Sequence, residues 1–198
     1  MIDFFLGKKD KEVEKRAKEL GFEKILFVKQ IEKESDFNKL QKENIEYDAC
    51  LIKIKNVEIM RKFIDKASNY FEYILVLGIN DDINRASLVH KKTFALVAPE
   101  FGRGKDFLSQ RDAGLNHVLC KIAKENNKTI IFRFSDVIES ENKASIIGKL
   151  AQNIKLCKKY ETKYIFVNFC SDLEEMLHHK ELESFERVLL MRNPKEHL

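Results

Sequence analysis

Short apolar runs recur along the chain and alternate with longer segments in which polar residues dominate. The runs are rich in β-branched and aromatic residues, and few polar residues interrupt them, which is typical of strands buried on both faces. We predict strands at residues 2–6, 24–28, 49–54, 73–77, 94–97, 129–132 and 164–169. The pattern therefore predicts about seven strands.

The segments between these runs carry apolar residues at spacings of three and four, which places them on one face of a helix. Three such rows are clear, and Gly21 ends the first of them as a C-terminal cap. The rows are Val13, Ala17 and Leu20; Val57, Met60, Phe63, Ile64 and Ala67; and Ala144, Ile147, Leu150, Ala151 and Ile154. Strands that alternate with helices form a parallel sheet with the helices outside it.

Two architectures fit this alternation: an open doubly wound sheet and a barrel. No Gly-x-Gly-x-x-Gly motif follows the first strand, and the connections are short and regular. Both features favour a barrel over a dinucleotide-binding sheet. The sequence contains no linker, no repeat of fixed period and no low-complexity tract. We therefore expect one α/β domain over residues 1–198, a TIM-like β/α barrel with about seven strands.

One connection is longer than the others. After the run at 94–97, residues 98–111 have neither a strand nor a helix pattern. Barrels carry their functional residues in the loops that follow strands, and long loops in compact domains are often functional. This loop holds Gly102 and Gly104, which permit close backbone approach, beside Arg103, Lys105 and Arg111.

Charge is unevenly distributed along the chain. The whole chain has a net charge of +4, but residues 85–133 hold ten basic and four acidic residues, so the remainder sums to −2. The basic residues are Arg85, Lys91, Lys92, Arg103, Lys105, Arg111, Lys121, Lys124, Lys128 and Arg133. Such an asymmetry indicates an anionic partner, of which nucleic acid is the commonest, although a solvated surface gives the same pattern.

The helix expected after the long loop has two distinct faces. Its apolar stripe consists of Leu115, Val118, Leu119, Ile122 and Ala123. His117, Lys121 and Lys124 form a basic row on the opposite side, which Arg111 and Lys128 extend at its two ends. Cations at this spacing can follow successive phosphates of a nucleic acid, and an ordinary lysine-rich outer face has the same spacing.

Catalytic constellations are not evident. The histidines form no His-x-His or His-x-x-x-His pair, and the acids Asp3, Asp48 and Asp136 at strand ends are scattered. No Gly-x-Ser-x-Gly surrounds Ser109. We expect this chain to hold neither a metal nor a catalytic residue.

Cysteine usage and hydropathy bear on the compartment. Four cysteines are present without a Cys-x-x-Cys pair, which is typical of reduced, packed cysteine in an intracellular protein. The apolar start is too short for a signal peptide, and no apolar run is long enough to span a bilayer. We expect a soluble cytoplasmic protein without a membrane partner.

Residues 109–123, which read Ser-Gln-Arg-Asp-Ala-Gly-Leu-Asn-His-Val-Leu-Cys-Lys-Ile-Ala, are followed by Asn126-Asn127-Lys128 and the run at 129–132. This segment resembles the signature of ribonuclease P protein component 3, the archaeal counterpart of the eukaryotic thirty-kilodalton ribonuclease P subunit. That family is similar to the polymerase-and-histidinol-phosphatase (PHP) metal barrels but lacks their histidine ligands. Asp3-Phe4-Phe5 stands here where a His-x-His would be expected.

The resemblance implies a subunit of ribonuclease P, the endoribonuclease that removes the 5′ leader from precursor tRNA. In that enzyme the RNA subunit is catalytic and holds the magnesium ions, so this chain would need no cofactor. The implied partners are ribonuclease P RNA, protein component 2 and the other protein subunits, with precursor tRNA contacted only indirectly. By matching positions, the expected RNA contacts are Arg103, Lys105, Arg111, His117 and Lys121, followed by Arg85 and Arg133. Asn116 is expected to fix the turn into the helix.

Two other functions fit the residues. One is an independent metal-dependent phosphoesterase of the PHP type, which requires a bound metal. The other is a barrel interaction protein with no nucleic-acid role, which would bind ribonuclease P RNA no more tightly than unrelated RNA.

Overall fold

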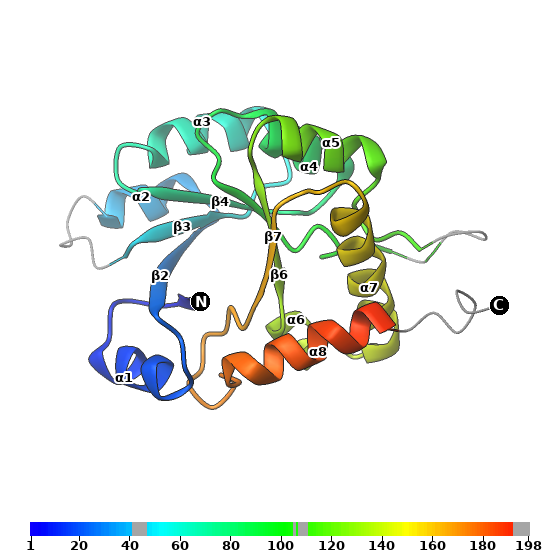
Figure 1. The fold of residues 1–198 in the computed structure, drawn as a ribbon. Helices are drawn as coiled ribbons and strands as arrows, with labels where there is room; N and C mark the ends of the chain where they lie inside the picture. Colours follow the sequence, from blue (N-terminus) through cyan, green and yellow to red (C-terminus); the bar gives the residue numbers. More distant parts are fainter. Residues whose placement is uncertain (41–46, 105, 107–110, 192–198) are drawn as a thin grey trace.

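The computed structural model describes residues 1–40, 47–104, 106 and 111–191. Seven parallel strands lie side by side in the order of the sequence, and helices surround them (Figure 1). The strands are β1 (Ile2–Leu6), β2 (Lys24–Ile31), β3 (Ala49–Ile52), β4 (Tyr73–Leu77), β5 (Ala95–Val97), β6 (Thr129–Arg133) and β7 (Tyr164–Val167). The helices are α1 (Lys11–Glu19), α2 (Glu34–Leu40), α3 (Val57–Ala67), α4 (Asp81–Val89), α5 (His117–Glu125), α6 (Ser135–Glu139), α7 (Lys143–Lys159) and α8 (His179–Met191).

The fold class predicted from the sequence is confirmed: the chain forms a TIM-like α/β barrel that is nearly closed. All seven predicted strands are present, and β1 and β4 have the predicted bounds. β7 ends at Val167 rather than at residue 169, and Phe169 adopts a left-handed conformation, with φ of 51°, that no strand can accommodate. The apolar rows do not predict α2, α4 or α6, which are short or carry few apolar residues.

Side chains of the strands alternate between two cores. Phe4 and Phe169 stack inside the barrel with ring centroids 5.3 Å apart. Phe5 and Phe27 point outward and pack beneath the helices. The remaining interior is mostly aliphatic and fully buried: Leu26, Val28, Ala49, Leu51, Leu75, Leu77, Ala95, Val97, Ile131 and Val167. The barrel is therefore a packed core rather than a channel.

The seam between β1 and β7 is the weakest part of the strand ladder. Across it the described residues form one isolated parallel bridge, Phe5 with Cys170, in which the Leu6 amide donates to the Cys170 carbonyl at 2.9 Å. All other neighbouring strands pair over three or more residues. Barrel closure therefore needs additional contacts at this seam.

A buried carboxylate supplies those contacts. Asp3, which is 0% exposed, accepts hydrogen bonds from the Asn168 amide nitrogen (3.0 Å), from Asn168 Nδ2 (2.7 Å) and from the Phe4 amide (2.9 Å). The Asn168 side chain also accepts a hydrogen bond from the Leu177 amide through Oδ1 (3.0 Å) and donates one to the Leu177 carbonyl through Nδ2 (3.1 Å). Burial raises the pKa of the Asp3 carboxyl to about 6, although these hydrogen bonds oppose the rise.

We expect Asn168→Ala to lower the free energy of unfolding by about 2–4 kcal/mol, because it removes three hydrogen bonds and leaves Asp3 and Leu177 with buried polar atoms lacking partners. Urea unfolding followed by circular dichroism measures this change. The matched control is Asn38→Ala on the exposed face of α2, which is expected to shift stability by less than about 0.5 kcal/mol. Equal midpoints for the two variants would contradict the role assigned to the seam.

Candidate functional site

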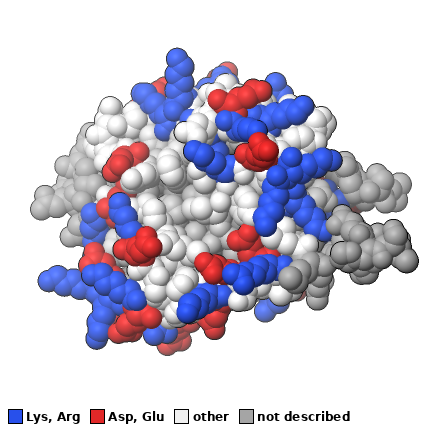
Figure 2. Space-filling view, in the orientation of Figure 1, with Lys and Arg blue, Asp and Glu red and all other residues white. Residues whose placement is uncertain are grey.

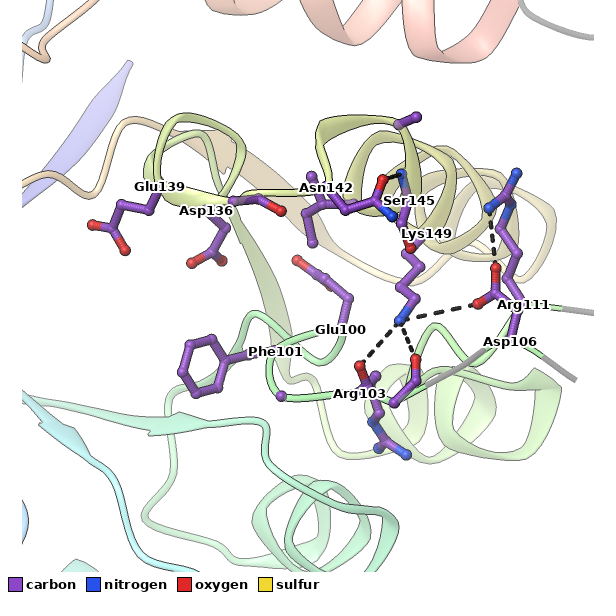
Figure 3. A pocket seen from close by; sticks show the side chains of 15 residues that line it. Glu100, Phe101, Arg103, Asp106, Arg111, Asp136, Glu139, Asn142, Ser145 and Lys149 are labelled. Carbon is purple, nitrogen blue, oxygen red and sulfur yellow. Dashed lines mark hydrogen bonds and ion pairs between the residues drawn. The ribbon is translucent and has the colours of Figure 1, made fainter.

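A cavity of about 920 Å³ lies at the mouth of the barrel, beyond the carboxyl ends of β5 and β6. The loop after β5 forms one wall, and α6 with the start of α7 forms the other (Figure 3). Barrels of this kind hold their active sites at this end. The side chains of the mouth are therefore the first candidates for a functional site.

Glu100 occupies the centre of the mouth, between Asp136 and Lys149 (Figure 3). It is 2% exposed, and its Oε2 accepts a hydrogen bond from Asn153 Nδ2 at 3.0 Å, whereas its Oε1 has no partner among the described residues. Burial, with a smaller effect from the nearby Asp136 charge, raises the pKa of the Glu100 carboxyl to about 8. This carboxyl is therefore mostly protonated at neutral pH.

Arg133 and Asp136 form a buried ion pair beside Glu100. Arg133 Nε lies 3.0 Å from Asp136 Oδ2, and a second hydrogen bond joins its Nη2 to Oδ1. The guanidinium also lies over the rings of Phe101 and Phe169, at 5.5 and 5.6 Å from their centroids. Arg133 is only 7% exposed, and Asp136 engages its guanidinium, so its predicted RNA contact stays a prediction that would require this pair to open.

Arg103 and Lys149 fasten the loop after β5. Arg103 Nη1 lies 2.7 Å from Asp81 Oδ1 and 3.4 Å from Asp112 Oδ1, and the side chain is 9% exposed. Lys149 Nζ donates to the carbonyls of Arg103 (3.3 Å) and Gly104 (3.0 Å). Arg103 therefore joins parts of the protein to one another, and its predicted RNA contact stays a prediction for a side chain with little exposed surface.

Arg111 lies at the outer edge of the mouth. Its Nη1 pairs with Asp106 Oδ2 at 3.1 Å, and its guanidinium covers Gly148, where an added Cβ would lie 2.5 Å from Arg111 Cζ. The side chain remains 45% exposed, so it stays a candidate for external contacts. Lys105, also predicted to contact RNA, lies outside the described residues.

The turn into α5 explains the local sequence Gly114-Leu115-Asn116. Gly114 has φ of +77°, and a Cβ there would lie 1.9 Å from the Pro99 carbonyl oxygen, so only glycine fits. Asn116 caps the helix as predicted, because its side chain accepts the Leu119 amide at 3.0 Å. These residues set where α5 begins and which of its faces is exposed.

The exposed face of α5 is basic, as predicted. His117, Lys121 and Lys124 are exposed, whereas Leu119, Cys120 and Ala123 are buried. Two details of the prediction are wrong. Val118 is 40% exposed, and Lys128 is 6% exposed because its Nζ donates to the carbonyls of Lys91 (3.0 Å) and Thr93 (2.6 Å).

More lysines gather where α5 and α7 end. Lys124 Nζ bridges to Glu161 Oε2 at 2.6 Å, Lys163 Nζ donates to Asn127 Oδ1 at 2.6 Å, and the His117 and Tyr160 rings lie 6.4 Å apart. We call Lys121, Lys124, Lys158 and Lys163 the basic rim; all four are exposed. Figure 2 shows Lys and Arg side chains gathered over the end of α7 nearest α5.

Half of this basic rim could not be predicted from the sequence. Lys158 and Lys163 lie beyond the basic segment 85–133, and only the fold brings them near α5. One signal was present in the sequence: α7 has five lysines and no Asp or Glu. Arg85, another predicted contact, is exposed on α4, which packs beside α5.

Within the described residues, no group of three or more His, Cys, Asp or Glu side chains is placed to hold a metal ion. None of the helices in this part of the chain is both long enough and apolar enough to cross a membrane.

Comparisons with known proteins give a consistent family. No family model matches the chain. Ribonuclease P protein component 3 of Methanococcus vannielii is 30% identical over 129 residues, which are 64% of this chain and 53% of the relative. The component 3 protein of Methanocaldococcus jannaschii is 24% identical over 146 residues, 73% of this chain and 60% of its own length. Over this part of its length the chain is similar to ribonuclease P protein component 3. It spans about half the length of the curated Methanococcus relatives that it matches.

Solved structures agree on the fold. A chain in a cryo-EM structure of archaeal ribonuclease P with mature tRNA superposes with a TM-score of 0.74 and 22% identity, covering 96% of this chain and 83% of that chain. An uncharacterised protein solved by crystallography gives a TM-score of 0.59 with 10% identity, covering 96% of this chain and 59% of its own. The component 3 signature thus lies in a barrel shared with both structures.

We expect the wild-type chain to lose stability as pH rises from about 4.5 to about 8. Over that range the folded Glu100 holds a proton that the unfolded chain releases, since its folded pKa is the higher of the two. The loss is at most about 5 kcal/mol from this group. Glu100→Gln removes the titration but keeps an acceptor for Asn153, so it should stabilise the protein more at pH 8 than at pH 5.

Urea unfolding at both pH values measures the effect. The control is Glu139→Gln, an exposed residue at the rim of the same cavity, which should leave the pH dependence unchanged. If Glu100→Gln and the wild type have parallel pH profiles, Glu100 is ionised in the folded protein at neutral pH, and the protonated state assigned to this carboxyl is wrong.

Proposed function

We propose that the chain is a protein subunit of ribonuclease P that supports the catalytic RNA in removing the 5′ leader from precursor tRNA. The observation that carries the proposal is the similarity to component 3 proteins over 129 residues. The chain itself is not the catalyst, and the magnesium ions belong to the RNA subunit. Its partners are ribonuclease P RNA, component 2 and other protein subunits, and it contacts precursor tRNA indirectly.

The barrel mouth supports a non-catalytic role. Its cations are engaged by groups of the chain itself: Arg133 by Asp136, Arg103 by Asp81 and Asp112, and Lys149 by loop carbonyls. Glu100 is mostly neutral at pH 7 and lies among them. A phosphodiester entering the mouth would have to displace these internal partners, at the cost of buried ion pairs.

We assign RNA binding to the outer surface instead. The basic rim presents lysines from α5, from α7 and from the loop after α7, with the His117 ring nearby, and lysines grouped in this way suit successive phosphates of an RNA backbone. Lysines at helix C-termini also stabilise the helix dipole, so charge alone does not prove a binding role. Arg85 and Arg111 are the candidates at the edges of this surface, and Lys105 stays a sequence-based prediction.

Reconstitution of the enzyme tests the proposal. Ribonuclease P RNA and the other protein subunits from the same organism are assembled with and without this chain, and precursor-tRNA cleavage is measured at fixed magnesium. We expect the chain to raise kcat/KM about ten-fold or more, which corresponds to about 1.4 kcal/mol of transition-state stabilisation, and to cleave nothing alone. Hydrolysis of a simple phosphoester by the chain with Mn²⁺, without RNA, would instead identify a PHP-type phosphoesterase.

Changing Lys121, Lys158 and Lys163 to Gln should weaken binding to ribonuclease P RNA and flatten its salt dependence. Each phosphate contact contributes about 0.7–0.9 to the slope of log K against log salt, so the slope should fall by about 2. Filter binding or fluorescence anisotropy at several salt concentrations measures both quantities.

The matched control changes three exposed lysines outside the basic rim to Gln: Lys11 of α1, Lys55 before α3 and Lys62 of α3. It removes the same charge and should leave the slope within experimental error. Equal effects of the two triple variants would mean that only the overall charge matters and that the basic rim is not the contact surface. Equal affinity of the wild type for unrelated RNA would favour an interaction protein without a role in this enzyme.

A further inference from the structure

A second cavity, of about 690 Å³, runs along the outer side of α7. Its floor consists of Ile147, Gly148, Ala151 and Leu156 of α7, with Leu189 of α8 at one side. These α7 residues are only partly buried in the folded chain. We call this cavity the α7 groove. Figure 1 shows α7 and α8 packed against each other on one side of the barrel.

The composition of this face is unusual for an outer helix. α7 already buries a complete core-facing row, Leu150, Asn153, Ile154 and Cys157. The outward face of α3, in contrast, is mostly charged, with Glu58, Arg61, Lys62 and Asp65 around one exposed apolar residue, Ile59. A helix that is apolar beyond its core-facing stripe is typically covered by another element.

Small residues make the floor accessible to a helix. Ala144, Gly148 and Ala151 follow one another along α7 at spacings of four and three, so a helix placed there can approach closely. Arg111 lies across Gly148 and is held by Asp106 and by a hydrogen bond from Gln152 Nε2 to the Arg111 carbonyl (3.2 Å). Arg111 therefore forms a fixed wall between the barrel mouth and the α7 groove, and it lines both cavities.

Charge determines which partner fits. The residues that line the α7 groove include three cations, Arg111, Lys155 and Lys159, and no carboxylate. Among the described residues Lys155 forms no ion pair, and Lys159 Nζ lies 5.8 Å from the centroid of the Tyr160 ring. An apolar floor with a basic edge complements a segment that has an apolar row flanked by Asp and Glu.

We infer that the α7 groove binds an amphipathic helix with acidic flanks from another protein. The identity of that protein rests on the proposed function, which places it among the other ribonuclease P subunits. The observations favour protein over RNA because aliphatic side chains and small residues give bases no aromatic surface on which to stack. The basic rim, with exposed lysines and few apolar neighbours, remains the surface assigned to RNA.

The test titrates the full chain with each of the other ribonuclease P protein subunits from the same organism, singly, by isothermal calorimetry. One subunit should bind, and Ala151→Glu should weaken its binding at least ten-fold, because the new carboxylate fills the floor and repels acidic flanks. Glu at 151 lies four residues before Lys155 and can pair with it, so α7 should stay folded. Lys155→Gln with Lys159→Gln, which leaves the floor intact, should weaken binding about three- to ten-fold and reduce its salt dependence.

Asn38→Glu is the control, since it adds the same charge on the exposed face of α2 and should leave binding unchanged. The inference is overturned if no subunit binds, or if a subunit binds and Ala151→Glu leaves its affinity unchanged. A loss of RNA affinity in Ala151→Glu without loss of subunit binding would make the groove an RNA surface. Self-association that Ala151→Glu abolishes, seen by sedimentation, would make the occupant a second copy of the chain.

These outcomes are separable from the proposed function, which depends on precursor-tRNA cleavage. If the chain binds a subunit through the α7 groove but does not stimulate cleavage, the proposed function is refuted and the inference about the groove stands. If the chain stimulates cleavage and Ala151→Glu still binds every partner normally, the proposed function stands and the inference about the α7 groove is refuted.

Discussion

The architecture depends on one buried carboxylate. Asp3 on the first strand accepts hydrogen bonds from the chain just after the last strand, and these bonds join the two edges that backbone pairing alone links through a single described bridge. Burial raises the free energy of the charged form, which is why its pKa is raised, yet the polar groups of Asn168 have no better acceptor. The seam fixes the barrel, and the barrel fixes the mouth and the outer helices.

The cations at the barrel mouth are paired within the chain, so the positive charge that is available to other molecules lies on the exterior. Arg133, Arg103 and Lys149 hold the loop and the strand ends together, so the place where barrels usually perform chemistry is occupied by their own contacts. Helix termini on the outside carry unburied lysines, and the outer side of α7 carries uncovered apolar residues. Such surfaces suit the proposed role, because a subunit of an assembly binds other molecules along its exterior rather than enclosing a substrate.

Periodicity predicted the strands well because most strand residues form short apolar runs that are buried on both faces. Asn116 was also recognisable, since a helix cap depends on local geometry. The burial of Arg103 and Arg133 could not be predicted, because it depends on carboxylates that the fold brings to them: Asp81 for Arg103 and Asp136 for Arg133. Lys158 and Lys163 were missed for the converse reason: the surface that they join is assembled from separate segments.

Lys128 counts as a basic residue in the sequence, but its side chain contributes almost nothing to the surface. Its ammonium group is held by the carbonyls of Lys91 and Thr93, beneath the amino end of the sheet. In a footprinting experiment with an amine-reactive reagent, Lys128 and Lys149 would be shielded in the free protein as well as in any complex. Only lysines that are modified in the free chain can report on what covers it, so a map of protection must start from that background.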